Sequence, residues 1–385
     1  MTRRDFLAAS AMLLRKDAPA VRAIEALPVR YPVTGYFRFF TKPERPAVFV
    51  KITCEDGATG WGQSVPIPTW SYETPESVTG TIRQYLAPPL IGLNPTDLAE
   101  AHRRMNRAIA PSFSTGTPIA KSGIDMALHD IAGKLAGKNI AELWQRKPVE
   151  KITLSWTVNV RSLQEAEELL EAGRKQGYRH FNIKVAPDPK FDVELARRVR
   201  RFAPECFLWA DANGGYDLAT ALEVLPKLRD AGVNVMEQPL PPNRLSGLRE
   251  LKKQGALPLL LDEGVVSVAD LEEFHKLGIL DGVAMKPART AGLWDGRQQV
   301  EYLEKHKLMF LGSGLTDPDV SLAASLVLYG AYGLKYPAAL NGLQFLAGSW
   351  LRQPFRLEDG ALRVPRGPGL GVEVDEERLR RDSQG

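Results

Sequence analysis

The chain has 385 residues, of which 44% are hydrophobic and 25% are charged, as in an ordinary globular protein large enough for two domains. Its formal net charge of +4 comes from scattered basic residues without a long Lys/Arg run, which argues against nucleic-acid binding, and no apolar run reaches the ~18 residues of a membrane span. Cys54 and Cys206 are far apart and in no paired motif, so neither a disulfide framework nor a zinc site is indicated.

Residues 1–20 are expected to be a separate segment. MTRRDFLAASAMLL places two arginines before a short apolar stretch, and Ala18-Pro19-Ala20 fits a small-residue cleavage site. This pattern resembles a twin-arginine export signal and predicts a periplasmic or exported protein. The alternative is a basic, weakly helical tail on a cytoplasmic protein.

Residues 21–148 are expected to form an α+β capping domain. VRAIEALPVRYPV and AVFVKITCEDGATGWGQ, with a turn at Asp56-Gly57, predict a small antiparallel sheet. ESVTGTIRQYLAPPL and IAKSGIDMALHDIAGKLAG predict helices that follow this sheet.

Residues 149–350 show a regular alternation of apolar strand-like segments with amphipathic helical stretches such as SLQEAEELLEAGRKQG. The eight expected strands are ITLSWTVNV, HFNIKVA, CFLWAD, VNVMEQP, LPLLLDE, GVAMKPA, LMFLGSG and YPAALNG. Eight such units predict an α/β fold, a TIM-like (β/α) barrel, whose chemistry lies at the carboxyl ends of the strands. Residues 351–385 contain a further turn and are expected to return to the capping domain.

Five successive strands of this barrel each end in one ionisable residue. In chain order they are Lys184, Asp211, Glu237, Asp262 and Lys286, spaced 27, 26, 25 and 24 residues apart. Each spacing corresponds to one βα unit, so the five residues are assigned to strands 2 to 6. Side-chain alternation then directs them toward the barrel mouth.

Three carboxylates at one rim need a cation, because burial and mutual repulsion would otherwise raise their pKa values. Oxygen ligands without His or Cys suit Mg²⁺, with Mn²⁺ as the alternative. Strands 2 and 6 lie opposite each other in an eight-stranded ring, so Lys184 and Lys286 are expected to face each other across the metal site. Burial beside a cation is expected to lower their pKa values and make either amine usable as a base.

A metal flanked by two lysines suits abstraction of the proton α to a carboxylate, through a metal-stabilised enediolate. Because a base is expected on each face, racemisation or epimerisation is the first prediction. The alternative is a lyase, either a dehydratase or a cycloisomerase, and a non-catalytic ligand-binding barrel is kept as a further alternative.

The chain resembles the enolase superfamily, in the mandelate racemase/muconate lactonizing enzyme family and its muconate-lactonizing-enzyme-like subgroup. The motifs that carry the resemblance are EDGATGWGQ, SGIDMALHDIAGKLAGK, NIK, DANGG, EQP, LDEG, MKPAR and GPGLGVEVD. The resemblance implies that Asp211, Glu237 and Asp262 bind Mg²⁺ and that Lys184 and Lys286 form the acid/base pair.

The sequence departs from the subgroup at several positions. Asn182 stands where the subgroup usually has the first lysine of Lys-x-Lys, and Asn341 stands where dipeptide epimerases have paired aspartates, which makes a dipeptide substrate less expected. Asp317, or Thr316 in another alignment, occupies a position that often holds Glu. Two further residues beside the metal ligands, Asn213 and Glu263, are expected to orient them.

Two loops of the capping domain, YPVTGYFRFFTKPER and SVPIPTWSYET, are implied by the resemblance to close over the barrel mouth. They carry Tyr36, Phe37, Phe39, Phe40, Trp70 and Tyr72 together with Arg38, Lys42 and Arg45. This mixture indicates a small, partly apolar carboxylate substrate that could carry a second anionic group. Trp70 is assigned either to this lid or to the core, and a homo-oligomer is left open.

Overall fold

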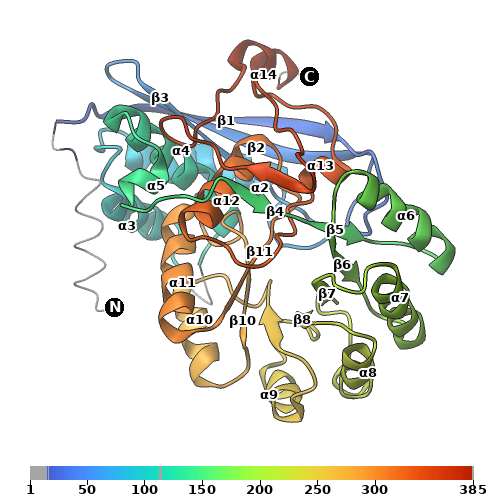
Figure 1. Cartoon of the computed structure of the whole chain (residues 1–385). Coiled ribbons are helices and arrows are strands. Elements are labelled where there is room, and N and C mark those ends of the chain that lie inside the picture. Colours follow the sequence, from blue (N-terminus) through green and yellow to red (C-terminus); the bar gives the residue numbers. More distant parts are fainter. Residues whose placement is uncertain (1–14, 16, 112–114, 384–385) are drawn as a thin grey trace.

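The structure, a computed structural model, describes residue 15 and residues 17–111 and 115–383. An α+β cap lies against a barrel of parallel strands surrounded by helices (Figure 1). Of the export signal predicted for residues 1–20, residues 1–14 and 16 lie outside the described residues, and the signal stays a prediction. No helix in the described part of the chain is long and apolar enough to cross a membrane.

The cap is built on a three-stranded antiparallel sheet in the order β1-β2-β3. Its strands are β1 (Val21–Pro32), β2 (Glu44–Cys54) and β3 (Thr59–Ser64). The predicted turn joins β2 to β3: Gly57 has a φ of +88°, which favours glycine, and its N–H donates to the Cys54 carbonyl at 3.0 Å.

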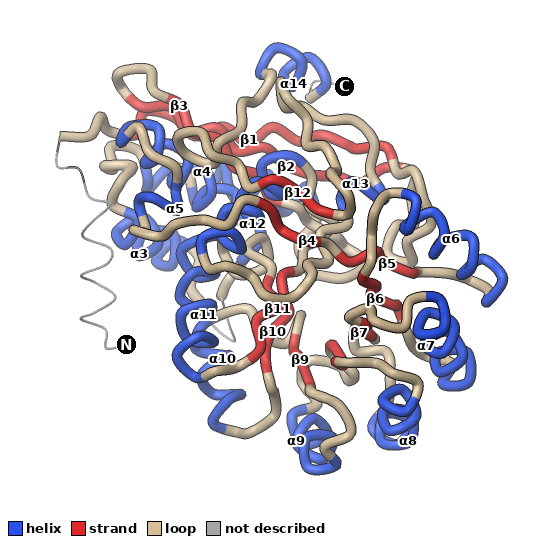
Figure 2. The backbone as a smooth tube through the Cα atoms, viewed as in Figure 1, coloured by secondary structure: helices blue, strands red, loops and turns tan. Residues whose placement is uncertain are grey.

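Helices cover one face of this sheet (Figure 2). They are α2 (Pro75–Thr81), the π-helical η1 (Ile82–Leu86), the 3-10 helix η2 (Pro88–Leu90), α3 (Leu98–Ala108), α4 (Pro118–Ala136) and α5 (Ile140–Leu143). Helix α3 was not predicted from the sequence. Residues 118–133 of α4 are all buried, because this helix lies between the sheet and the barrel helices.

The contact between β3 and α4 requires glycine at Gly62. A Cβ atom at this position would lie 1.9 Å from the carbonyl oxygen of Gly123 in α4. We expect Gly62→Ala to lower the free energy of unfolding by about 3 kcal/mol, because backbone of a buried helix would have to move. Urea denaturation measures this change.

Gly80 in α2 provides the control, because a Cβ atom there would meet no atom within 4 Å. Gly80→Ala should raise stability by up to about 1 kcal/mol through helix propensity. Equal changes in the free energy of unfolding for Gly62→Ala and Gly80→Ala would contradict the close approach of β3 to α4.

The barrel sheet has seven parallel strands in sequential order. They are β5 (Ser155–Val158), β6 (His180–Lys184), β7 (Leu208–Asp211), β8 (Val235–Glu237), β9 (Leu259–Leu261), β10 (Gly282–Met285) and β11 (Met309–Gly312). Inside the ring, one cluster of Trp209, Val235, Leu260, Ala284, Leu311 and Ala339 fills the interior. The barrel is therefore a packed core with its open end at the strand termini.

The eighth expected strand, YPAALNG, is reduced to two bridges. Leu154 pairs with Ala338, and Ser313 pairs with Ala339, which closes the ring between β11 and the start of β5. Pro337 has no N–H to donate, so regular pairing does not extend further toward the amino end of this segment. The predicted TIM-like barrel with a cap is confirmed, except that its eighth strand is reduced to these two bridges.

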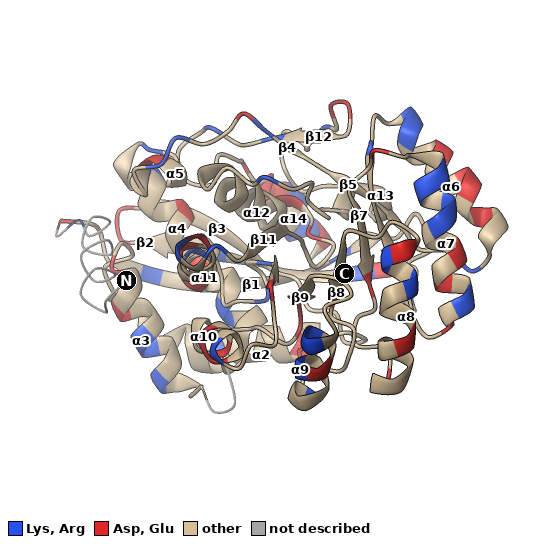
Figure 3. Cartoon of the chain, turned by 60° about the horizontal axis from the view of Figure 1, so that its bottom comes forward, with Lys and Arg blue, Asp and Glu red and all other residues tan. Residues whose placement is uncertain are grey.

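Helices connect the barrel strands and form its outer layer (Figure 2). They are α6 (Leu163–Lys175), α7 (Pro189–Phe202), α8 (Leu218–Asp230), α9 (Leu245–Gln254), α10 (Val268–Lys276), α11 (Leu293–His306) and α12 (Asp319–Ala331). Basic and acidic residues are interspersed along α6, α7 and α8 (Figure 3). These helices present no single-sign surface of the kind that nucleic acids bind.

The C-terminal segment contacts both parts of the molecule. Its elements, preceded by α13 (Gly342–Phe345), are β12 (Ala361–Arg363), which pairs with β4 (Lys151–Thr153), and α14 (Glu376–Asp382), which contacts β1. The Leu370 N–H donates to the Asp130 carboxylate of α4 at 2.9 Å, and Arg380 forms an ion pair with Glu25 of β1.

Candidate functional site

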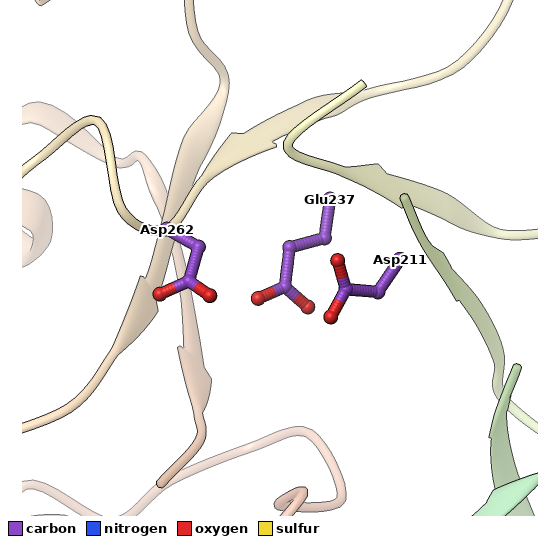
Figure 4. A group of neighbouring side chains, drawn as sticks. All are labelled: Asp211, Glu237 and Asp262. Atoms are coloured by element: carbon purple, nitrogen blue, oxygen red, sulfur yellow. The ribbon is translucent and has the colours of Figure 1, made fainter. Parts of the chain in front are cut away.

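Three carboxylates meet at the carboxyl ends of neighbouring barrel strands. Asp211 ends β7, Glu237 ends β8, and Asp262 follows β9 directly. One oxygen from each lies within 4.8 Å of the others, and each residue is at most 1% exposed. Figure 4 shows the three carboxyl groups gathered at one place, although the residues are about 25 positions apart in the chain.

The carboxylates strongly affect one another. Burial, followed by the charges of Asp211 and Asp262, raises the pKa of Glu237 well above its usual value. Burial acts in the same direction on Asp262, but Lys286 and Arg289 outweigh it and lower the pKa of Asp262 to about 2. The repulsion expected from the sequence is therefore present at Glu237.

This cluster fits a divalent metal ion. Its donors are all carboxylate oxygens, the ligands that hard cations prefer. Trp209 donates to Oε2 of Glu237 at 2.5 Å, whereas Oε1 of the same group is buried without a hydrogen-bond partner. Glu237 thus keeps one oxygen available for a cation.

The two lysines flank the carboxylates, one from each side of the strand order. Lys184 ends β6 and contacts Asp211, and its Nζ also donates to Oδ1 of Asn213 at 3.1 Å. Lys286 follows β10 and contacts Asp262, with its Nζ 3.9 Å from Oε1 of Glu237. All five residues predicted for the barrel mouth are brought together.

The downward shift of the lysine pKa, expected beside a bound cation, stays a prediction for Lys286, because without a cation its pKa is shifted upward. Burial lowers the pKa of Lys286, but the charges of Asp262 and Glu237 raise it, and the net shift is upward. The expectation depended on a neighbouring cation, and the carboxylates by themselves act in the opposite direction.

Other predicted residues divide into those that line the mouth and those that support it. Asn182, Asn341 and Thr316 line the pocket above the carboxylates. Asp317 does not line it: this carboxylate accepts from Ser325 Oγ at 3.0 Å and points toward α12. Of the two alignments considered for this position, the structure places Thr316 at the pocket.

Asn213 and Glu263 lie beside the carboxylates. The Asn213 N–H donates to Oδ1 of Asp211 at 2.8 Å, so this residue contacts both Asp211 and Lys184. Oε2 of Glu263 is buried, and burial together with Asp262 and Asp211 raises the pKa of this carboxyl well above the usual value.

Side chains of the two cap loops narrow the pocket to about 30 Å³. Those that line it are Phe37, Phe39, Ile67 and Trp70. Nζ of Lys286 lies 4.9 Å from the centre of the Trp70 ring, and Nζ of Lys184 lies 5.7 Å from the centre of the Phe37 ring. Trp70 thus lies over one of the two lysines, and it also packs against the hydrophobic core.

The basic residues of these loops do not reach the pocket. Arg38 donates to the carbonyls of Val185 and Ala186, and Arg45 is 1% exposed and donates to the carbonyls of Val65, Pro66 and Leu315. Lys42 lines a separate cleft of the cap. The suggestion that the substrate carries a second anionic group depended on these three cations, and they do not line the pocket.

Arg289 is a site residue that was not predicted from the sequence. It follows β10, is 2% exposed, and contacts Asp262 while donating to the Ala284 carbonyl at 3.0 Å. Its only sequence signal is its place in MKPAR, three residues after Lys286. A buried arginine beside Asp262 places a second positive charge next to this carboxylate.

A barrel with acidic groups at its strand ends, closed by an α+β cap, defines an enolase-like enzyme. The model of the enolase C-terminal domain-like family matches residues 164–378, and that of the mandelate racemase/muconate lactonizing enzyme N-terminal domain matches residues 20–144. The chain belongs to the mandelate racemase/muconate lactonizing enzyme family of the enolase superfamily, as its motifs indicated.

Relatives and solved structures agree with this assignment. Chloromuconate cycloisomerase of Cupriavidus necator is 31% identical over 92% of this chain and 95% of its own length. Muconate cycloisomerase 1 of Rhodococcus opacus is 27% identical over 92% and 96%. The structure of muconate lactonizing enzyme from Pseudomonas putida superposes with a TM-score of 0.87 at 25% identity, covering 94% of this chain and 99% of that one. The protein is an enolase-superfamily isomerase or lyase, and members of this superfamily bind a divalent metal ion.

Proposed function

We propose that the protein is a divalent-metal-dependent cycloisomerase or related lyase that acts at the carbon α to a substrate carboxylate. The observation that carries this proposal is the cluster of three buried carboxylates with a lysine on each side. The names of the relatives, muconate and chloromuconate cycloisomerases, support this lyase-type chemistry over the racemisation first expected from the sequence.

Asp211, Glu237 and Asp262 would hold the metal ion, and we propose Mg²⁺, with Mn²⁺ as the alternative, because all three ligands are carboxylates. When bound, the ion supplies positive charge that stabilises the additional negative charge on the substrate carboxylate. Asn213 orients Asp211 through its N–H and accepts a hydrogen bond from Lys184, so it fixes both groups relative to each other.

Lys184 and Lys286 are the proposed proton carriers, each positioned to remove a proton from, or deliver one to, the α-carbon of a substrate lying between them. Phe37, Phe39 and Trp70 line this space with aromatic side chains. Because the pocket holds only about 30 Å³, the cap loops must move before a substrate enters.

Epimerisation is the second candidate, and the placement of a lysine on both sides of the carboxylates favours it. Incubation with Mn²⁺ or Mg²⁺ in D₂O with a panel of carboxylic acids, including cis,cis-muconate, separates the two. Ring closure or elimination with deuterium uptake supports the lyase, whereas exchange with inversion supports the epimerase. Absence of exchange and product across the panel would refute both.

Metal binding is expected to raise the thermal stability of the protein. Since the ion would bind only the folded cluster, Mn²⁺ at 100 times its Kd should stabilise the protein by about 2.7 kcal/mol, measured as a rise in Tm. Glu237→Gln keeps the shape of the side chain and removes one of three repelling charges, so this variant should be more stable without metal and gain less from it. A variant with an undiminished Mn²⁺ response would contradict the assignment of Glu237 as a ligand.

A further inference from the structure

The loop that joins β3 to α2 is held at its end by a buried carboxylate. Glu73 is 3% exposed, and its two oxygens accept from the N–H groups of Ile119 and Ala120 at 2.7 and 2.9 Å. These N–H groups lie in the first turn of α4, whose own N-cap residue, Thr117, makes no side-chain hydrogen bond to the helix. The Glu73 carboxylate takes the place of that N-cap side chain and ties the loop to α4.

The same loop carries Trp70, three residues before Glu73. The Trp70 N–H donates to the Ile67 carbonyl at 2.9 Å, which forms a tight turn, and Nζ of Lys286 lies 4.9 Å from the centre of the Trp70 ring. The ring belongs to the cap and the lysine belongs to the barrel, so this contact joins the two domains. Only two residues separate Trp70 from the attached carboxylate, so the place of the ring depends on how that end of the loop is held.

Helix α4 also holds the barrel segment that follows Lys286. Oδ2 of Asp125 accepts from the N–H groups of Leu293 and Trp294, at the start of α11, at 2.5 and 3.3 Å. One helix therefore binds the Trp70 loop at its first turn and the segment after Lys286 further along its length. The position of the Trp70 ring relative to the lysine amine is set through α4.

We propose that Glu73 is a positioning residue that holds the Trp70 ring over the amine of Lys286. Glu73 does not line the pocket and acts through the loop, whereas Trp70 is the group beside the lysine. Lys286 is 4% exposed with the ring in this place, so a ring that moves away leaves the amine more accessible. This inference rests on the proposed function, in which Lys286 carries the proton, and adds a residue outside the pocket to that site.

Acetylation of Lys286 by acetic anhydride measures the accessibility of this amine and needs no substrate. The full chain is labelled in buffer with Mn²⁺, and peptide mass spectrometry compares the acetylation rate of Lys286 with that of Lys51. The reference lysine lies in β2 of the cap, pairs with Glu376 at 2.6 Å and has a side chain that is 12% exposed, so it reports general unfolding of the cap. Burial raises the pKa of Glu73 to about 7, so the reaction is run above this pH, where the carboxylate is ionised.

Glu73→Ala should speed the acetylation of Lys286 relative to Lys51 at least ~10-fold, because two hydrogen bonds to a charged acceptor are lost. Glu73→Gln keeps one acceptor oxygen and should give a smaller gain of ~3-fold. Trp70→Ala should have an effect at least as large as Glu73→Ala, and the double variant should acetylate Lys286 no faster than Trp70→Ala alone. Glu55→Ala, which removes an exposed carboxylate of the same domain, is the control and should leave the rate unchanged.

An unchanged acetylation rate of Lys286 in Glu73→Ala would overturn the inference, and so would equal gains at Lys286 and Lys51. If Glu73→Ala does not fold, Glu73→Gln decides: a gain confined to Lys286 supports the positioning role, and no gain overturns it. A double variant that labels faster than Trp70→Ala would show that Glu73 does not act through the ring. The proposed function fails separately, by absence of turnover of every acid in the D₂O panel, whatever the acetylation shows.

Discussion

Lys286→Met is expected to slow net turnover of the substrate by about 10²–10⁴-fold, the usual contribution of a positioned acid or base. Lys286 is 4% exposed, and its amine lies beside the carboxylate of Asp262 and over the Trp70 ring, where an amine is held at the mouth of the barrel. Methionine keeps an unbranched side chain of similar length and removes the amine. Turnover of the best acid in the D₂O panel, followed by NMR, measures the loss.

The matching substitution Lys184→Met separates the two candidate reactions. An epimerase needs both lysines for interconversion, so each variant should lose inversion while keeping exchange on one face. A lyase with one working base should lose most activity in one variant and much less in the other. Lys252→Met removes a lysine that pairs with Asp281 at 2.5 Å outside the pocket, and this control should keep full activity. Unchanged turnover in both Lys184 and Lys286 variants would refute the catalytic assignment.

The five ionisable residues of the mouth could be predicted because each depends on local pattern alone. A strand end recurs once in every βα unit, so a spacing of 24 to 27 residues places Lys184, Asp211, Glu237, Asp262 and Lys286 on neighbouring strands. The parallel register of the barrel then brings them together without further information. The fold followed from the same alternation.

What escaped prediction depends on contacts between distant segments. Arg289 matters because its guanidinium turns back onto Asp262, and Arg45 does not line the pocket because four backbone carbonyls engage its guanidinium. The short eighth strand follows from Pro337, whose missing N–H has no effect on the apolar pattern of YPAALNG. Periodicity reports which face a residue occupies, and it carries no information about what that side chain meets.

Asp125 of α4 is the clearest case of such a distant contact. It is fully buried, and its Oδ1 lies 2.7 Å from Nε2 of His102. Its Oδ2 lies 3.2 Å from Nδ1 of His129 and accepts from the N–H groups of Leu293 and Trp294 at 2.5 and 3.3 Å. These N–H groups belong to the first turn of α11. A carboxylate of the capping domain thus caps the N-terminus of a barrel helix that begins 168 residues further along the chain.

Asp125→Asn is therefore expected to lower the free energy of unfolding by about 3–5 kcal/mol at pH 7, measured by urea denaturation. Burial alone would raise the pKa of Asp125, but His129 and His102 outweigh it and the net shift is downward. A lowered pKa in the folded state stabilises the protein above the unfolded pKa of about 3.9, and this contribution is lost as the pH falls further. The difference between the two proteins should thus shrink below about pH 4.

Asp295, in the first turn of the same helix, provides the control, because its pKa is shifted in the opposite direction from that of Asp125. Burial raises the pKa of Asp295 to about 6, so its ionised form is less favourable in the folded state than in the unfolded state. Asp295→Asn should accordingly leave stability at pH 7 unchanged or increase it. Equal losses in both variants would mean that α11 tolerates no change at its start, whereas a loss confined to Asp125→Asn would show that the carboxylate holds the cap to the helix that follows Lys286 and Arg289.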